Sequence, residues 1–74
     1  MRTTYVFKKA NDGGLARQAQ GILNIIEARG KINKEDLLAQ ITMDVRSRQK
    51  AQRLLSYYKG QLVSDGLIEE IKHG

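Results

Sequence analysis

Several residue types that support catalysis are absent or rare in this chain. None of its 74 residues is cysteine, which excludes disulfides, thiolate nucleophiles and cysteine-based metal sites. The only histidine is His73. The acidic pairs at residues 35–36 and 69–70 are adjacent in sequence, and adjacent side chains on a helix or strand point in different directions. We therefore expect no enzymatic activity, no metal site and no cofactor.

Long apolar runs are also missing. No stretch approaches the roughly 20 apolar residues of a membrane-spanning helix, and the N-terminus lacks the apolar segment of a signal peptide. The length suits one domain, residues 1–74, close to the lower limit at which a hydrophobic core stabilises itself. We expect a soluble cytoplasmic protein that does not associate with membranes. A homodimer could add to the stability of so small a domain.

Positive charge is concentrated in two stretches. The net charge is +5 and the pI about 9.8. Residues 45–60 carry five cations and no acid, residues 1–11 carry three cations and no acid, and the remainder has more acids than cations. A basic surface of this kind can bind phosphates. The alternative interpretation is a solvated surface that only aids solubility.

The distribution of apolar residues and breakers predicts two strands and three helices. Residues 3–9 alternate as in a strand, and the Asn-Asp-Gly-Gly cluster at 11–14 ends it. Helical spacing predicts a first helix over residues 15–29, followed by Gly30 and a two-residue extended link. A closing strand is predicted over residues 67–71.

The second and third helices are predicted to be separated by a tight turn. Asn33 is the expected N-cap of a short helix from Lys34 to about Gln40. Residues 42–44 are expected to form the turn, with Thr42 or Asp44 as the cap of a third helix over residues 45–64. The apolar stripe of that helix, expected to face the core, consists of Ala51, Leu54, Leu55, Tyr58 and Leu62. At 100° per residue, the opposite direction is occupied by Gln49, Arg53, Ser56 and Gly60.

The order helix, link, short helix, turn, longer helix and strand over residues 15–71 resembles winged helix-turn-helix DNA-binding domains. The resemblance is carried by Gly30-Lys31-Ile32-Asn33 and by the run from Leu62 to Ile68. It implies an α+β fold, in which three helices pack with a small antiparallel sheet.

One departure from the family affects the sheet. The family usually has two strands joined by a loop, the wing, after the third helix, but only eight residues follow Gly66. We therefore expect the N-terminal strand to pair with the C-terminal strand and to bury Phe7 or Tyr5 against the helices. Contacts of a wing with the minor groove are then in doubt.

The resemblance implies that the third helix reads the major groove of double-stranded DNA. Arg46, Gln49 and Arg53 are the candidates for base contacts, because Arg suits guanine and Gln suits adenine. Candidates for phosphate contacts, which position a protein without reading sequence, are Ser47, Arg48, Lys50, Tyr57, Lys59, Lys8 and Lys9. The simplest role is a small transcriptional regulator.

Other functions stay open. Winged-helix folds also serve as protein–protein adaptors, and the same helix would then bind an acidic protein partner. RNA binding is less favoured, because the aromatic residues that stack on bases are few and scattered. A homodimer would place two third helices about 34 Å apart on a palindromic site. Its contact could involve the first helix or the edge of the N-terminal strand.

Overall fold

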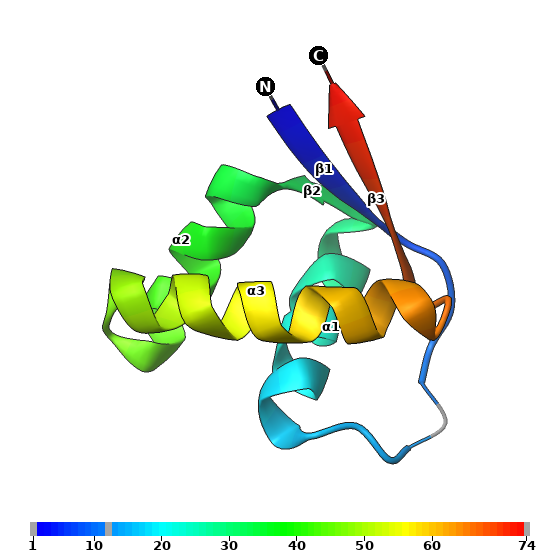
Figure 1. Ribbon diagram of the computed structural model, residues 1–74, viewed down its shortest axis with the longest axis horizontal. Helices are drawn as coiled ribbons and strands as arrows, with labels where there is room; N and C mark the ends of the chain where they lie inside the picture. Colours follow the sequence, from blue (N-terminus) through cyan, green and yellow to red (C-terminus); the bar gives the residue numbers. More distant parts are fainter. Residues whose placement is uncertain (1, 12, 74) are drawn as a thin grey trace.

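Three helices pack against one face of a three-stranded antiparallel sheet (Figure 1). The computed structural model describes residues 2–11 and 13–73. The elements in chain order are β1 (Arg2–Phe7), α1 (Arg17–Arg29), β2 (Lys31–Asn33), α2 (Lys34–Val45), α3 (Arg48–Ser64) and β3 (Ile68–His73). The expected α+β class is confirmed. Asp12, part of the predicted breaker cluster, lies outside the described residues.

β1 is the middle strand of the sheet, whose order is β2-β1-β3. It pairs with β3 from Arg2 opposite His73 to Phe7 opposite Ile68, so the expected pairing of the two terminal strands is confirmed. The other edge of β1 pairs with β2, at positions that the sequence suggested were only a link. Three residues are too few to show an alternating pattern, which is why β2 was missed. Figure 1 shows β1 and β3 extending together beyond the helices, with the two ends of the chain side by side.

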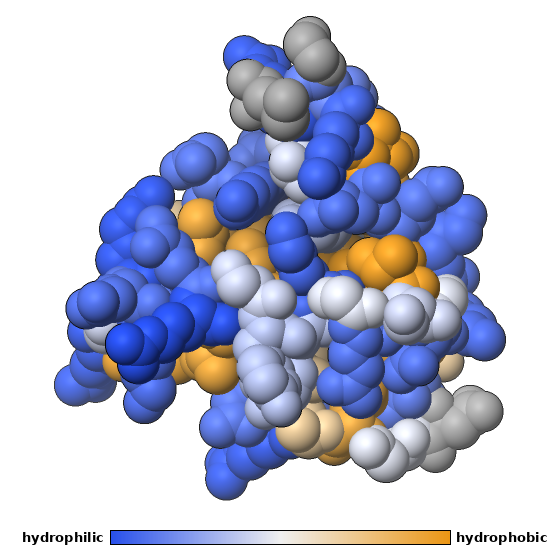
Figure 2. All heavy atoms as spheres, in the orientation of Figure 1, coloured by the Kyte–Doolittle hydropathy of each residue, from blue (hydrophilic) through white to orange (hydrophobic). Residues whose placement is uncertain are grey.

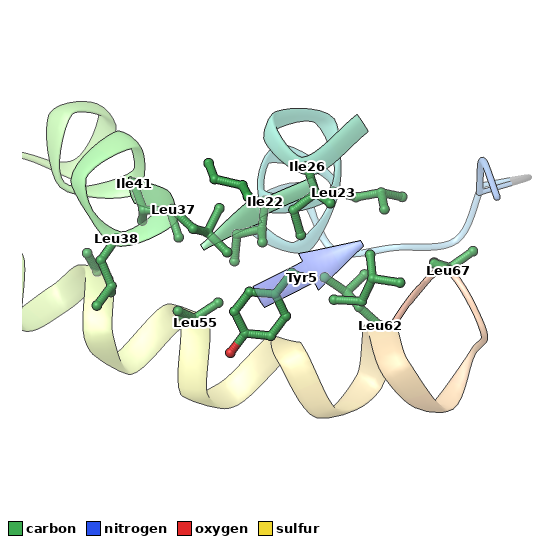
Figure 3. Packing of buried hydrophobic residues seen from close by; sticks show 13 residues of the cluster. Tyr5, Ile22, Leu23, Ile26, Leu37, Leu38, Ile41, Leu55, Leu62 and Leu67 are labelled. Carbon is green, nitrogen blue, oxygen red and sulfur yellow. The ribbon is translucent and has the colours of Figure 1, made fainter. Parts of the chain in front are cut away.

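Tyr5 occupies the centre of the core. Its side chain is fully buried, and Figure 3 shows it beside α3, close to Leu55 and Leu62. Phe7, the alternative candidate on the same strand, is only partly buried. The remaining core residues come from all three helices, β2, β3 and the residue before β3: Ala19, Ile22, Leu23, Ile26, Ile32, Leu37, Leu38, Ile41, Ala51, Leu67 and Ile68. Two members of the predicted apolar stripe of α3, Leu54 and Tyr58, are half-buried against this core.

The hydroxyl of Tyr5 donates a hydrogen bond to Oε2 of Glu70 on β3, at 3.0 Å. The same carboxylate oxygen lies 3.4 Å from Nζ of Lys59 on α3. Burial and this hydrogen bond raise the pKa of Tyr5 well above its usual range. Burial alone would raise the pKa of Glu70, but the hydrogen bond from Tyr5 and the charge of Lys59 outweigh it, so the pKa is lowered. The three side chains thus join β1, β3 and α3 through one carboxylate.

The turn before α3 differs from the prediction. α2 continues to Val45, so residues 42–44, expected to form the turn, are helical. Thr42 does not cap α3, because its hydroxyl donates to the carbonyl of Leu38 inside α2. The helix ends instead at Arg46, which has a left-handed backbone with φ 59°. Helix α3 consequently begins at Arg48 and not at Val45.

Side chains cap α2 and α3 in the same way. Asn33 Oδ1 accepts from the amide of Asp36 at 2.8 Å, which confirms the predicted cap of α2. Ser47 Oγ accepts from the amide of Lys50 at 3.2 Å and caps α3, a role that the sequence analysis gave to Thr42 or Asp44. Each cap satisfies one of the amide donors that a helix leaves free at its N-terminus. Helix α1 has no side-chain cap and begins two residues later than predicted.

We expect Tyr5→Phe to lower the free energy of unfolding by about 1.5 kcal/mol at pH 7, because the carboxylate of Glu70 loses a charge-assisted hydrogen bond. The pKa of Glu70 is lowered by folding. The charged form of Glu70 therefore stabilises the folded protein. This stabilisation is complete above about pH 4.3, the pKa of a glutamate in the unfolded chain, and is lost as the pH falls through the pKa of Glu70 in the folded protein. The difference between the two proteins should shrink accordingly in acid.

The measurement is urea unfolding at several pH values. Tyr58→Phe is the matched control, because the hydroxyl of Tyr58 has no side-chain hydrogen bond among the described residues. A Tyr5→Phe deficit that is unchanged in acid would contradict a role for the charge of Glu70.

We expect Arg46→Gly to raise the free energy of unfolding by about 0.5–1 kcal/mol. A left-handed backbone costs an L-residue about 1–2 kcal/mol, whereas glycine adopts it freely and loses roughly 0.5–1 kcal/mol more backbone entropy on folding. Arg46→Ala retains the Cβ and should give no such gain. Urea unfolding of both variants makes the comparison, and equal stabilities would show that the left-handed backbone carries no cost here.

Candidate nucleic-acid interface

The outward face of α3 is polar and free of acid. Helix α3 contains no aspartate or glutamate. Five exposed residues spaced three and four apart line one shallow hollow along it: Gln49, Gln52, Arg53, Ser56 and Tyr57. Gln49 and Arg53, two of the three residues predicted to contact bases, therefore lie together on the surface. The direction assigned to them from helical geometry is confirmed, because the opposite side of the helix carries Ala51, Leu55 and Leu62 in the core.

Gln52 also belongs to this face, although it is not among the residues predicted from the sequence. It is exposed and lines the same hollow as Gln49 and Arg53. It follows Gln49 by three residues and precedes Ser56 by four, so the helical period alone could have identified it. An amide side chain can donate and accept hydrogen bonds at once, which adds a second adaptable contact to the face.

Arg46 and Ser47 precede α3 in the turn. Arg46, the third residue predicted to contact bases, is exposed at the C-terminal end of α2. Ser47, predicted to contact phosphate, is half-buried, and its oxygen accepts the capping hydrogen bond from the amide of Lys50. The hydroxyl proton of Ser47 remains available as a donor, since the cap uses only the oxygen as an acceptor.

Three of the cations predicted to contact phosphates already have acidic partners. Nη2 of Arg48 lies 3.3 Å from Oε2 of Glu35 on α2, with both side chains exposed. Nζ of Lys59 lies 3.4 Å from Oε2 of Glu70. Nζ of Lys8 is 4.0 Å from Oε1 of Glu69, a marginal contact between exposed side chains.

The other cations near the N-terminal half of α3 differ from these three in their ionic contacts. Within residues 2–11 and 13–73, Arg46, Lys50 and Arg53 have no carboxylate within ion-pair distance. All three are exposed. The structure thus separates the predicted cations into those that already hold a partner and those that are free to bind a phosphate.

The predicted phosphate contacts do not form one cluster. Lys8 and Lys9 follow β1, and both of their amides donate to the carbonyl of Leu67, just after the C-terminal end of α3. Helix α3 has 17 residues and is therefore about 25 Å long at 1.5 Å per residue. Lys8 and Lys9 lie at the opposite end of this length from Arg46. Among the predicted contacts, Arg46, Gln49, Lys50 and Arg53 belong to the turn before α3 and its N-terminal half.

Tyr57, one of the candidates for phosphate contacts, is 75% exposed on the outward face. Its ring meets the ring of Tyr58 edge to face, with the centroids 4.7 Å apart and the planes at 80°. Tyr58 in turn packs against the core. The half-buried ring of Tyr58 therefore supports the ring of Tyr57. Tyr57 lies beside Arg53, and its hydroxyl donor is exposed to solvent.

The face of the molecule that α3 crosses is mainly polar. In Figure 2 its apolar side chains lie in small separate patches. Another hollow, with charges of both signs, is lined by Arg2, Thr3, Thr4, Asn33, Lys34, Glu35, Asp36 and His73. Among the described residues, no group of acidic and histidine side chains is placed to hold a metal ion. None of the helices in this part of the chain has the length and apolar character needed to cross a membrane.

The chain gives no significant match to protein-family models, to curated proteins or to solved structures.

Proposed function

We propose that this protein binds double-stranded DNA as a winged helix-turn-helix domain and acts as a small transcriptional regulator. The observation that carries the proposal is the outward face of α3, which is free of acid and places Gln49, Gln52 and Arg53 together on the surface. The inward face of α3 is fixed by Ala51, Leu55 and Leu62. A helix held in this way can enter the major groove as a rigid element.

In this proposal Arg53 and the two glutamines read bases. Arginine can bind O6 and N7 of guanine through two hydrogen bonds, and glutamine can bind N6 and N7 of adenine. Lys50 and the turn before α3 contact the flanking phosphates, which fix the position of the helix without reading sequence. Tyr57 adds a contact to the sugar-phosphate backbone through its exposed hydroxyl. A DNA-binding role also accords with the cytoplasmic location expected from the sequence.

The backbone of Arg46 supports a functional role for its side chain. It is the only non-glycine residue with positive φ among those described. The position favours glycine, since a left-handed conformation brings the Cβ of other residues too close to the backbone. Unfavourable conformations are often found at functional sites, where the side chain is needed. Arg46 is exposed at the entrance to α3, where a cation can reach DNA.

The ion pairs imply that DNA binding competes with contacts inside the protein. To bind a phosphate, Arg48 would have to leave Glu35 and Lys59 would have to leave Glu70. An exposed pair such as Arg48 and Glu35 is worth only about 0–1 kcal/mol. Replacing Glu35 by a phosphate as the partner of Arg48 therefore costs little free energy. Lys59 is only one-third exposed and its partner Glu70 also holds Tyr5, so we assign Lys59 to structure. Engaging about four phosphates gives a log–log salt slope of roughly −3 to −4.

An adaptor that binds an acidic protein partner is the alternative. The buried centre of a protein–protein interface is usually more apolar than the rest of the surface. Among residues 2–11 and 13–73, the exposed large apolar side chains come from three elements, with Met43 on α2, Tyr57 and Val63 on α3, and Ile71 on β3. This distribution favours the DNA interface over an adaptor surface on α3.

Arg53→Glu should lower the affinity for duplex DNA about 100-fold, because it removes a guanidinium from the groove and brings a carboxylate close to phosphates. The measurement is fluorescence anisotropy with random duplex DNA at two salt concentrations. Arg29→Glu is the matched control: it makes the same change in net charge at the end of α1, at an exposed position outside the proposed interface. Equal losses in the two variants would show that only net charge matters and would contradict the assignment of α3.

Glu35→Gln should raise the affinity for DNA about 3-fold, because Arg48 then needs no exchange of partners before it binds a phosphate. The control is Glu27→Gln, which removes one exposed negative charge from α1. The same anisotropy titration measures both variants. If Glu27→Gln strengthens binding as much as Glu35→Gln, the ion pair of Arg48 does not limit binding.

A further inference from the structure

The outer edge of β3 is an open edge of the sheet. β1 has neighbours on both sides, so the edge of the N-terminal strand, one of the dimer contacts left open by the sequence, is not available. β3 pairs with β1 on one side only, over six residues. The last three residues of β3 and Glu69 are exposed. An open edge carries a row of backbone donors and acceptors to which another strand can add.

The register of the sheet shows which backbone groups of β3 point outward. The amide of Lys8 donates to the carbonyl of Leu67, and hydrogen bonding alternates along an antiparallel strand. Residues 69, 71 and 73 therefore direct their amides and carbonyls towards β1. Those of Glu70 and Lys72 point away from the sheet, where a further strand would bind.

The sequence of this edge is complementary to itself. Residues 69–73 read Glu-Glu-Ile-Lys-His. A second copy related by a two-fold axis through Ile71 places Glu70 opposite Lys72 of the other copy, and Glu69 opposite the other His73. The first of these pairs has opposite charges, and in the second an imidazole N–H can donate to a carboxylate. Ile71, 36% exposed in one copy, meets its own equivalent on the axis.

This register also satisfies the backbone. Glu70 and Lys72 are the residues whose backbone groups point outward, and they face each other across the axis as a hydrogen-bonded pair. Moving the axis to Glu70 would place two carboxylates opposite each other, and moving it to Lys72 would do the same with two ammonium groups. An axis between residues would bring together side chains from opposite faces of the sheet. Both charge and geometry therefore select the axis at Ile71.

We propose that β3 pairs antiparallel with β3 of a second copy, so that two chains form a homodimer with one continuous six-stranded sheet. Such an interface is isologous, as in most homodimers. It uses a surface separate from the outward face of α3 and does not depend on DNA binding. The interface is small, so we expect a dimer that forms reversibly at micromolar to millimolar concentrations.

Cross-linking through an introduced cysteine tests the register. The chain has no cysteine, so Ile71→Cys introduces a single thiol per copy. In the proposed dimer the two thiols lie in a non-hydrogen-bonded pair with Cα atoms about 4.5 Å apart, which suits a disulfide. Under mild oxidation, the disulfide-linked dimer should form at least about 10-fold faster than in Glu69→Cys or His73→Cys, whose thiols on the same face would be about 13 Å apart.

A mixture of Glu69→Cys and His73→Cys should regain cross-linking, because these two positions face each other. Equal rates for all three single variants, or no gain in the mixture, would overturn the register.

The oligomeric state provides the second test. Sedimentation of the unmodified chain should show a mass that rises from 8.4 kDa towards twice that value between about 10 and 500 µM. Lys72→Pro removes an outward amide that the ladder with β1 does not use, and should weaken association at least about 10-fold. Lys72→Ala retains the amide and should weaken it less. Circular dichroism checks that both variants are folded. A monomer throughout the range, or equal effects of both substitutions, would contradict pairing through this edge.

Discussion

The burial of Tyr5 is the constraint on which the rest of the structure depends. Tyr5 lies on the middle strand, so its position fixes β2 and β3 on either side. Its ring packs beside Leu55 and Leu62 and thereby sets the rotation of α3 about its own axis. Its hydroxyl binds Glu70, which also holds Lys59. One side chain thus determines which face of α3 is turned outward.

That rotation links the core to the proposed interface. With Leu55 and Leu62 turned inward, the period of the helix leaves Gln49, Arg53 and Tyr57 no direction but outward. Two acids outside α3 bind cations towards its two ends. Glu70 on β3 pairs with Lys59, and Glu35 on α2 pairs with Arg48. Free positive charge remains in the N-terminal half, beside the turn at Arg46. The surface that we propose for DNA is therefore a consequence of how the core is packed.

The sequence was sufficient to predict the features that covalent geometry determines. The helical period placed Gln49 and Arg53 on one face, and the short chain after Gly66 indicated that the terminal strands pair. Features set by tertiary contacts were not predictable. β2 is three residues long and is a strand only because β1 lies beside it. The ion pair of Arg48 joins residues 13 positions apart, and helix propensity gave no sign that α2 would continue to a left-handed Arg46.

The pairing of the first and last strands has a consequence for folding. Tyr5 and Glu70 are 65 positions apart, so their contact closes a loop of about that length, at an entropic cost of about 4 kcal/mol. Contacts of this range slow folding relative to those within helices. During synthesis the helices emerge between the two strands and can begin to form before β3 exists. β1 is therefore synthesised before β3 and can complete its pairing only after β3 has left the ribosome.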